Sequence, residues 1–188
     1  MFSTELPLPK DRELYLTKQV NQDSMGELTR KILEINKSDK YNKQFYKLHG
    51  LKYKRQPIKI YIDSYGGQVY QCFGLLSVME QSKTPIHTIV TGCAMSCGFM
   101  ILISGHKRYA YNLSTPLYHQ VSSAMYGKLK DLEEDVMETK RLQALIEEIT
   151  LKKTRITPER LKEVFEKKID WFMDAKQALE LGVVDEII

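Results

Sequence analysis

A serine among small residues is the first group in this sequence that could carry out catalysis. Ser96 stands in TGCAMSCGFMILISG (Thr91–Gly105), flanked by Ala94 and Gly98 and followed by an apolar run. A serine at a sharp strand-to-helix turn exposes its hydroxyl and lies beside helix N–H groups that can stabilise a negative charge. The pattern is not the G-x-S-x-G elbow, because residue 94 is alanine. On its own it favours a serine that caps a helix.

A serine nucleophile needs a base, and the base needs an acid that orients it. Of four histidines, His119 ends a short expected strand in PLYHQV (116–121), where its side chain can project from the edge of a sheet. Asp170, in IDWFM, is expected in a half-buried segment, where a carboxylate needs a partner. Both have structural alternatives, since a histidine in a strand is commonly structural and an aspartate can cap or pair locally.

Two glycines in SYGG, Gly66 and Gly67, separate an expected strand (58–63) from an expected helix (68–81). Glycines in such a turn let backbone N–H groups approach a ligand closely, as an oxyanion hole requires. The same pair would also suit an ordinary turn. The glycines alone therefore leave both roles open.

The elements that must position these residues alternate between strands and helices. Strands are expected at 13–20, 58–63, 85–92, 107–111 and 116–121, and helices at 24–35, 68–81, after Ser96, at 127–153, and after the caps Thr157 and Asp174. This alternation predicts an α/β fold with mostly parallel strand pairing.

Composition suits one globular domain over residues 1–188, with 43% hydrophobic residues and a net charge of +4. Cys72, Cys93 and Cys97 have no metal-type spacing and are expected as free thiols in a reducing cytoplasm. The N-terminus has no leader pattern and the longest apolar run is too short to cross a bilayer. We therefore expect a cytoplasmic protein without a membrane partner.

Residues 37–56 form a basic segment with six lysines and one arginine against a single acid, Asp39. Aromatic residues are interleaved, which is typical of segments that bind nucleic acid or a partner. A solvated face is the simpler interpretation, because charge runs usually are just that. We expect a basic surface insertion at about 37–56 and no nucleic-acid partner.

Taken together and in order, three stretches of the chain resemble the ClpP family, the proteolytic subunits of the Clp protease, which are serine peptidases. The stretches are IKIYIDSYGGQVYQCFGLLSVME, PIHTIVTGCAMSCGFMILISGHKRYAYNLSTPLYHQ and IDWFMDAKQALELGVVDEII. The resemblance implies that Ser96 is the nucleophile, His119 the general base and Asp170 the acid that orients His119. It also implies that the backbone N–H groups of Gly67 and Cys97 form the oxyanion hole.

The implied reaction is acyl transfer, in which Ser96 attacks a peptide carbonyl, His119 moves the proton and water releases the acyl group. No cofactor or metal is expected at the site, and ATP would act only at a partner ATPase. The resemblance further implies a ClpP/crotonase-like spiral of β-α-β units, with the helix after Gly127 as a handle. It implies a homo-oligomer, a heptameric ring or two stacked rings, to which an AAA+ unfoldase delivers unfolded protein substrates.

The sequence departs from the family pattern at four places. The family usually follows HQ with proline and a glycine-rich strand, whereas this chain has VSSAMYG (121–127). Ile169 stands where the family commonly has an arginine that helps rings to meet. The N-terminal gate loops are expected to be short or absent, and the basic segment is longer than the usual connection. These departures affect substrate preference and assembly more than the peptidase chemistry.

Four alternative functions can be set against a serine peptidase. A crotonase-type enzyme acting on a CoA thioester would share the fold and the oxyanion hole without needing a Ser, His and Asp set. A non-catalytic ring scaffold would be expected to lack one of the three residues. Cys97 as the nucleophile is disfavoured because its side chain should point into the helix packing, and a Ser–Lys pair lacks a lysine in a matching motif.

Overall fold

The computed structural model describes residues 11–188. The elements in chain order are β1 (Glu13–Leu16), α1 (Gln22–Leu48), β2 (Ile58–Ser64), α2 (Val69–Gln81), β3 (Ile86–Met95), α3 (Cys97–Ile103), β4 (Lys107–Ala110), β5 (Thr115–Tyr118), α4 (Leu129–Lys153), α5 (Pro158–Glu166), β6 (Trp171–Phe172), α6 (Ala175–Glu180) and β7 (Glu186–Ile187). The expectations about a leader and about short N-terminal loops concern residues 1–10, which lie outside the described residues.

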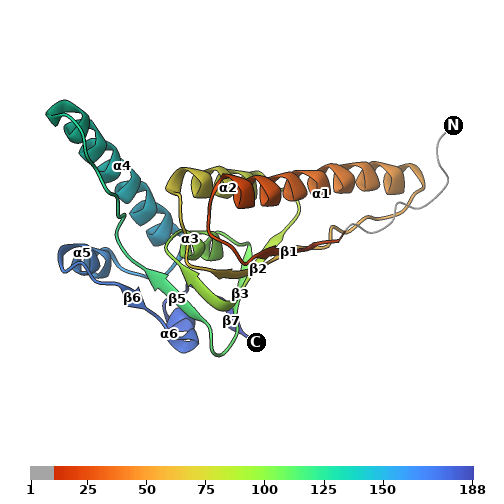
Figure 1. Cartoon of the computed structure of the whole chain (residues 1–188). Coiled ribbons are helices and arrows are strands. Elements are labelled where there is room, and N and C mark those ends of the chain that lie inside the picture. The colour runs from red at the N-terminus through yellow and green to blue at the C-terminus, as the bar shows by residue number, and fades with distance from the viewer. Residues whose placement is uncertain (1–10) are drawn as a thin grey trace.

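A mostly parallel sheet forms the centre of the fold, as the alternation of elements predicts (Figure 1). β1, β2, β3, β4 and β7 follow one another in the sheet, and each of these pairs is parallel. In β2, Ile58, Ile60 and Ile62 are fully buried and alternate with more exposed residues. Because side chains of a strand point to opposite faces in turn, this pattern buries one face of β2 in the core.

The long strand β3 determines where the candidate site lies. Its first half pairs with β4, whereas Cys93–Met95 pair with Thr115–Leu117 of β5. β5 in turn pairs with the short antiparallel strand β6. The ends of β3 and β5 therefore lie together, and Ser96 and His119 follow directly from these two neighbouring ends.

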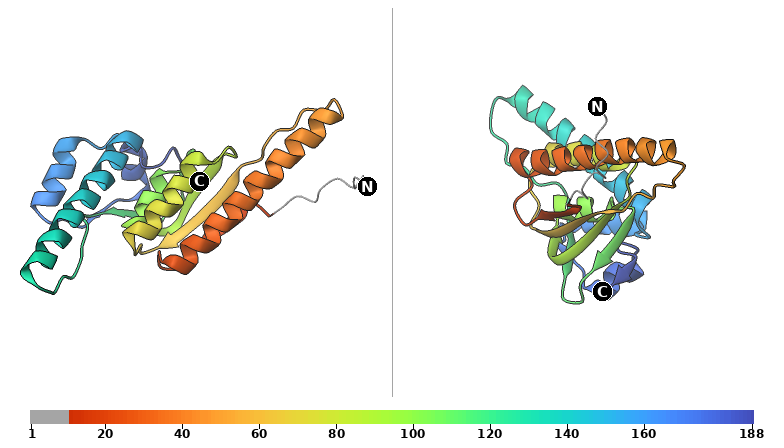
Figure 2. Two further views of the ribbon diagram at one scale, coloured as in Figure 1. Left: turned by 90° about the horizontal axis from the view of Figure 1, so that it is seen from above. Right: turned by 90° about the vertical axis from the view of Figure 1, so that its right-hand side faces the viewer.

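Helices α1 and α2 lie side by side over one face of the sheet, with α3 closer to its centre (Figures 1 and 2). All residues of α3 are buried, so the apolar run after Ser96 belongs to the protein core. Across residues 11–188, no helix combines the length and the hydrophobicity that a membrane span requires.

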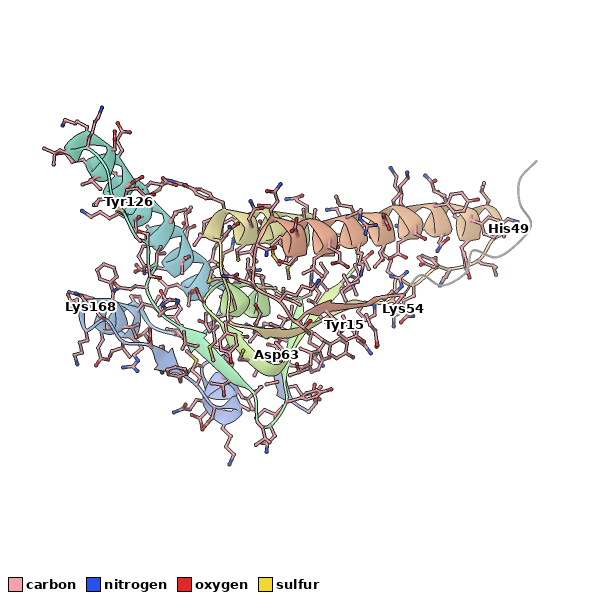
Figure 3. All side chains as sticks on the ribbon, viewed as in Figure 1. Tyr15, His49, Lys54, Asp63, Tyr126 and Lys168 are labelled. Carbon is pink, nitrogen blue, oxygen red and sulfur yellow. The ribbon has the colours of Figure 1, made fainter. Side chains whose placement is uncertain are left out.

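Helix α1 extends well beyond its predicted end. The spacing of apolar residues predicts a helix over 24–35, whereas the helix continues to Leu48 and residues 49–57 then return without regular structure. We call residues 37–57 the basic arm. It extends away from the sheet, and Figure 3 shows His49 near its far end and Lys54 on the returning segment.

The basic arm is anchored by its single acid, Asp39, which is fully buried. Arg12 donates to both oxygens of this carboxylate, at 3.1 and 2.5 Å, and the hydroxyls of Tyr53 and Thr84 each donate at 2.6 Å. Burial raises the pKa of Asp39, but these hydrogen bonds outweigh burial and hold the pKa below its ordinary value. The lysines of the arm are exposed as expected, whereas Asp39 lies in the core.

The C-terminal helices begin at the predicted caps. Thr157 accepts a hydrogen bond from the Arg160 N–H, and Asp174 and Gln177 form a capping box.

α4 matches the helix predicted over 127–153. Residues 122–141, which we call the projecting segment, contain no buried side chain and extend away from the sheet (Figure 1).

Candidate active site

Ser96 occupies the sharp turn between β3 and α3. Its φ of 54° and ψ of −118° place a non-glycine residue in a rarely populated backbone region, which costs about 1–3 kcal/mol. Its backbone N–H donates to the carbonyl of Leu117 at 3.1 Å, which ties the turn to β5. The side chain makes no capping hydrogen bond to α3, so a helix-capping role for this serine is not supported.

The turn of Gly66 and Gly67 packs directly against Ser96. A Cβ on Gly66 would lie 2.6 Å from the Met95 carbonyl oxygen and 2.9 Å from the Ser96 Cβ, and Gly66 has a φ of 92°. Gly67, with a φ of 149°, pairs with Val20 as an isolated parallel bridge. Both positions thus require glycine, because of close approaches and because of their backbone conformation.

The N–H groups predicted for the oxyanion hole are available at this turn. Within residues 11–188, neither the Gly67 N–H nor the Cys97 N–H donates to a protein acceptor. The residues on either side of Gly67 are held by Val20. The Val20 N–H donates to the Gly66 carbonyl, and the Gln68 N–H donates to the Val20 carbonyl, each at 2.8 Å. Two unpaired N–H groups beside a serine are the arrangement that stabilises an oxyanion.

The thiol of Cys97 is held in the core and faces α2, as its place in the helix predicts. Its Sγ lies 3.3 Å from the Gly67 carbonyl oxygen, and the Cys72 Sγ lies 3.6 Å from the Cys97 carbonyl oxygen. The proximity of the two thiols lowers the pKa of Cys97 and raises that of Cys72. Cys72, Cys93 and Cys97 are all free and buried, in agreement with the expected free thiols.

His119 follows β5 directly and shares two cavities with Ser96. A small cavity of about 50 Å³ is lined by Gly67, Ser96, His119 and apolar side chains that include Met100. A wider groove of about 580 Å³ is also lined by Gly67, Ser96 and His119. The structure therefore brings the predicted nucleophile, base and one oxyanion donor to a common surface. The strand predicted over 116–121 ends earlier, at Tyr118.

Asp170 lies beside His119 in a segment that is half-buried, as expected, since Ile169 and Trp171 are partly buried, but the Asp170 side chain itself is exposed. Its side chain is 67% exposed and that of His119 is 24% exposed. The Asp170 Oδ1 and His119 Nδ1 atoms are 3.8 Å apart, which is too long for a hydrogen bond. Asp170 is exposed because the pairing of β6 with β5 begins only at Trp171, one residue after Asp170.

The predicted relay is therefore open in this structure. Within the described residues, no hydrogen bond joins the Ser96 hydroxyl to His119. Such bonds are often long or poorly aligned in ligand-free enzymes and tighten when substrate binds. The proximity of the three residues remains, whereas their alignment is incomplete.

A polar residue beside the site was not identified from the sequence. Gln143, on α4, is 7% exposed, and its Oε1 accepts the N–H of Val121 at 2.8 Å. Tyr118 also lies here, and its buried hydroxyl has no hydrogen-bond partner among residues 11–188. Burial beside Glu147 raises the pKa of Tyr118. A glutamine on the apolar stripe of a helix is the signal that could have identified Gln143.

The other histidines lie outside the two cavities shared by Ser96 and His119. His106 accepts the backbone N–H of Ile86, His87 lies against Tyr109 on the sheet, and His49 belongs to the basic arm. In the part of the chain that the structure describes, no group of three or more His, Cys, Asp or Glu side chains is arranged to hold a metal ion.

Comparisons with known proteins agree with the resemblance seen in the sequence. A profile described as Clp protease matches residues 6–188. An ATP-dependent Clp protease proteolytic subunit of Deinococcus radiodurans is 35% identical over 135 residues, which cover 71% of this chain and 65% of that protein. An ATP-dependent Clp protease proteolytic subunit 2 of Bacillus licheniformis is 30% identical over 183 residues, covering 96% of this chain and 88% of that protein.

The chain thus spans just under two thirds of the first relative and most of the second. The expected family is confirmed. By its sequence and its α/β fold, this chain belongs to the Clp protease family.

Proposed function

We propose that this chain is a serine endopeptidase in which Ser96 is the nucleophile, His119 the general base and Asp170 the acid that orients His119. The observation that carries the proposal is the strained backbone of Ser96 at a turn whose cavity also contains His119 and Gly67. Strain of this kind persists where the surrounding structure enforces it, commonly at reactive residues. Family membership independently supports peptide hydrolysis.

In the proposed reaction, the hydroxyl of Ser96 attacks the carbonyl carbon of a peptide bond while His119 takes its proton. The N–H groups of Gly67 and Cys97 stabilise the negative charge on the carbonyl oxygen. His119 then gives the proton to the leaving amine, and water, activated by His119, releases the acyl group from Ser96. These steps use groups of this chain alone, so we propose that the site needs no cofactor and that ATP acts only at a partner.

Substrate is proposed to bind as an extended, unfolded chain in the 580 Å³ groove beside Ser96. The names of the relatives describe subunits of ATP-dependent proteases, which supports a partner ATPase of the unfoldase type. We propose a homo-oligomeric ring, heptameric and either single or stacked. Large apolar side chains on the projecting segment support contact with a second copy, since Tyr126, Leu129 and Met137 are each at least 70% exposed.

We propose a cytoplasmic location, which the three free thiols support because unpaired cysteines suit a reducing compartment. A crotonase-type enzyme remains the alternative in another class. The observation against it is that His119 shares a cavity with Ser96 and that Asp170 lies 3.8 Å from His119, a set that such chemistry does not need. A non-catalytic scaffold would have no reason to maintain a strained serine.

Hydrolysis of a short fluorogenic peptide and of an unfolded protein tests the proposal. Ser96→Ala should lower kcat/KM by about 10⁴-fold or more, because removal of a serine nucleophile leaves only the binding and oxyanion contributions. Ser104→Ala is the matched control, since Ser104 lies at the other end of α3 and bonds to the Met100 carbonyl. Equal activity of wild type and Ser96→Ala would contradict the proposal.

A further inference from the structure

Gln143 is a buried side chain, and each of its two polar atoms makes a hydrogen bond. Its Oε1 accepts the backbone N–H of Val121 at 2.8 Å, and its Nε2 donates to Glu147 Oε1 at 2.7 Å. Leu142, Gln143, Ile146 and Thr150 are the buried residues of α4. A buried amide in a mostly apolar contact has a free-energy cost unless it is hydrogen-bonded, so both bonds are needed to keep Gln143 there.

The Val121–Gln143 bond closes the base of the projecting segment. The chain leaves the body of the protein after Val121, and α4 becomes buried again from Leu142 onward. Every residue in between is at least partly exposed, and Figure 3 shows Tyr126 near α4, away from the sheet. One hydrogen bond therefore joins the residues on either side of the projecting segment.

The same bond lies two residues after His119. For residues 119–127, it is the one hydrogen bond that we find for the backbone within the described chain. β5 ends at Tyr118, so the sheet does not hold the backbone beyond that residue. The direction in which the chain continues from His119 is thus set mainly by Gln143.

We propose that Gln143 is a positioning residue for the general base, an inference that rests on the proposed function. By fixing Val121, it limits the movement of the His119 backbone relative to Ser96. Ser96 itself is bound to β5 through the Leu117 carbonyl, so the nucleophile has its own anchor. Loss of the Gln143 bond should therefore affect the base and spare the nucleophile and the glycine turn.

Three variants separate positioning from packing. Gln143→Met keeps the volume of the side chain and removes the acceptor. Glu147→Gln is the matched control, because it leaves the acceptor for Val121 intact. The double variant Gln143→Glu with Glu147→Gln exchanges the two side chains, so a carboxylate accepts from Val121 and from the new amide at residue 147.

Peptide hydrolysis by the full-length protein is the readout, with thermal stability and oligomeric mass measured in parallel. We expect Gln143→Met to lower kcat by about tenfold with KM within about twofold, because a misplaced base loses part of the 10²–10⁴-fold that proton transfer contributes. We expect Glu147→Gln and the exchanged pair to stay within about threefold of wild type, since an acceptor for the Val121 N–H remains. If Gln143 had only a structural role, Gln143→Met would lower thermal stability without a selective loss of kcat over KM, and the exchanged pair would not restore kcat.

Hydrogen exchange on the wild-type protein gives a readout that needs no variant. The Val121 amide should exchange at least about tenfold more slowly than those of Ser122 and Ser123, which lie in the projecting segment. The inference is overturned if Val121 exchanges as fast as its neighbours, or if folded Gln143→Met retains full kcat. If wild type shows no Ser96-dependent hydrolysis at all, the proposed function fails and this inference with it.

Discussion

Ser96 and the glycine turn are fixed by backbone contacts on several sides, whereas His119 and Asp170 lie at the edge of the fold. Ser96 bonds to the Leu117 carbonyl, and a Cβ on Gly66 would not fit between Met95 and Ser96. Asp170, by contrast, is 67% exposed and 3.8 Å from His119. The proposed nucleophile and the proposed oxyanion donors are preformed, while the proposed proton relay is not.

This difference follows from where each residue lies in the sheet. Ser96 follows a strand that is paired on both sides, with β2 and β5 as its neighbours at that end. His119 follows a four-residue strand, and Asp170 precedes a two-residue strand. Long strands in the middle of a sheet position side chains more rigidly than short strands near its margin, which open more easily. We therefore expect substitutions in the two regions to have different consequences.

The largest effect in the relay should come from His119→Ala. We expect kcat/KM to fall by about 10⁴-fold, because the base both removes and returns a proton. The folded protein should remain, since the side chain is partly exposed and makes no hydrogen bond within residues 11–188. His49→Ala, in the basic arm, is the control and should leave peptide hydrolysis unchanged. A mild effect of His119→Ala would mean that another group acts as the base.

Gly66→Ala probes the preformed region. Its Cβ would lie 2.6 Å from the Met95 carbonyl and 2.9 Å from the Cys97 nitrogen, so the serine turn must shift. We expect kcat to fall by about 10²–10³-fold, the range seen when one oxyanion donor is lost. Gly74→Ala is the control, because no atom lies within 4 Å of its added Cβ, and alanine should stabilise α2 by about 0.5–1 kcal/mol. Similar kinetics for the two variants would refute a preformed turn.

Asp170→Asn should have a smaller effect than His119→Ala. In sites where the acid is buried and hydrogen-bonded, the same substitution lowers kcat by about 10⁴-fold. Because Asp170 is exposed and 3.8 Å from His119, we expect kcat to fall by only about 10²-fold. The loss should be smaller at high salt, because salt screens the interaction between exposed charges. A loss as large as that of His119→Ala would show that the relay closes fully in the working enzyme and that the contrast between the two regions disappears there.

Asp39→Asn should change stability and leave the chemistry intact. It leaves Arg12 without its carboxylate partner next to the core, so we expect a loss of about 2 kcal/mol in the free energy of unfolding, with kcat unchanged. The pKa of Asp39 is lower in the folded state than in the unfolded state. Its contribution is therefore present above the unfolded pKa, near 3.9, and disappears as the pH falls through the folded pKa.

Urea unfolding at neutral and acidic pH measures the Asp39 effect. Glu13→Gln is the control, because the Glu13–Lys59 pair is about half exposed and should contribute less than about 1 kcal/mol. Equal free energies of unfolding for wild type and Asp39→Asn at neutral pH would contradict the claim that Asp39 anchors the basic arm.

The sheet and the serine turn could be predicted because their signals are local. Alternating apolar residues in 58–63 and the small residues around Ser96 are visible within a few positions. The length of α1 was not predicted in this way, because residues 36–48 are mostly polar and contain few apolar or aromatic residues, Tyr41, Phe45, Tyr46 and Leu48. That part of the helix is held by distant contacts, including Asp39 with Arg12 and the ring of Tyr46 against that of Tyr53.

The exposure of Asp170 and the role of Gln143 also depend on distant partners. Sequence spacing brings neither residue to His119, and only the pairing of β5 with β6 and the return of α4 do so. A polar residue among apolar ones, such as Gln143 beside Leu142, signals a buried hydrogen bond but does not identify its partner.

Fluorophosphonate labelling of the assembled wild-type protein, followed by mapping of the labelled peptide, tests the central claim most directly. Because the serine turn and its donors are preformed, we predict one adduct, on Ser96, that is absent in Ser96→Ala and slowed strongly in His119→Ala. Labelling should persist, more slowly, in Asp170→Asn. An adduct on another residue, or no adduct on folded and assembled protein, would contradict a preformed Ser96 nucleophile.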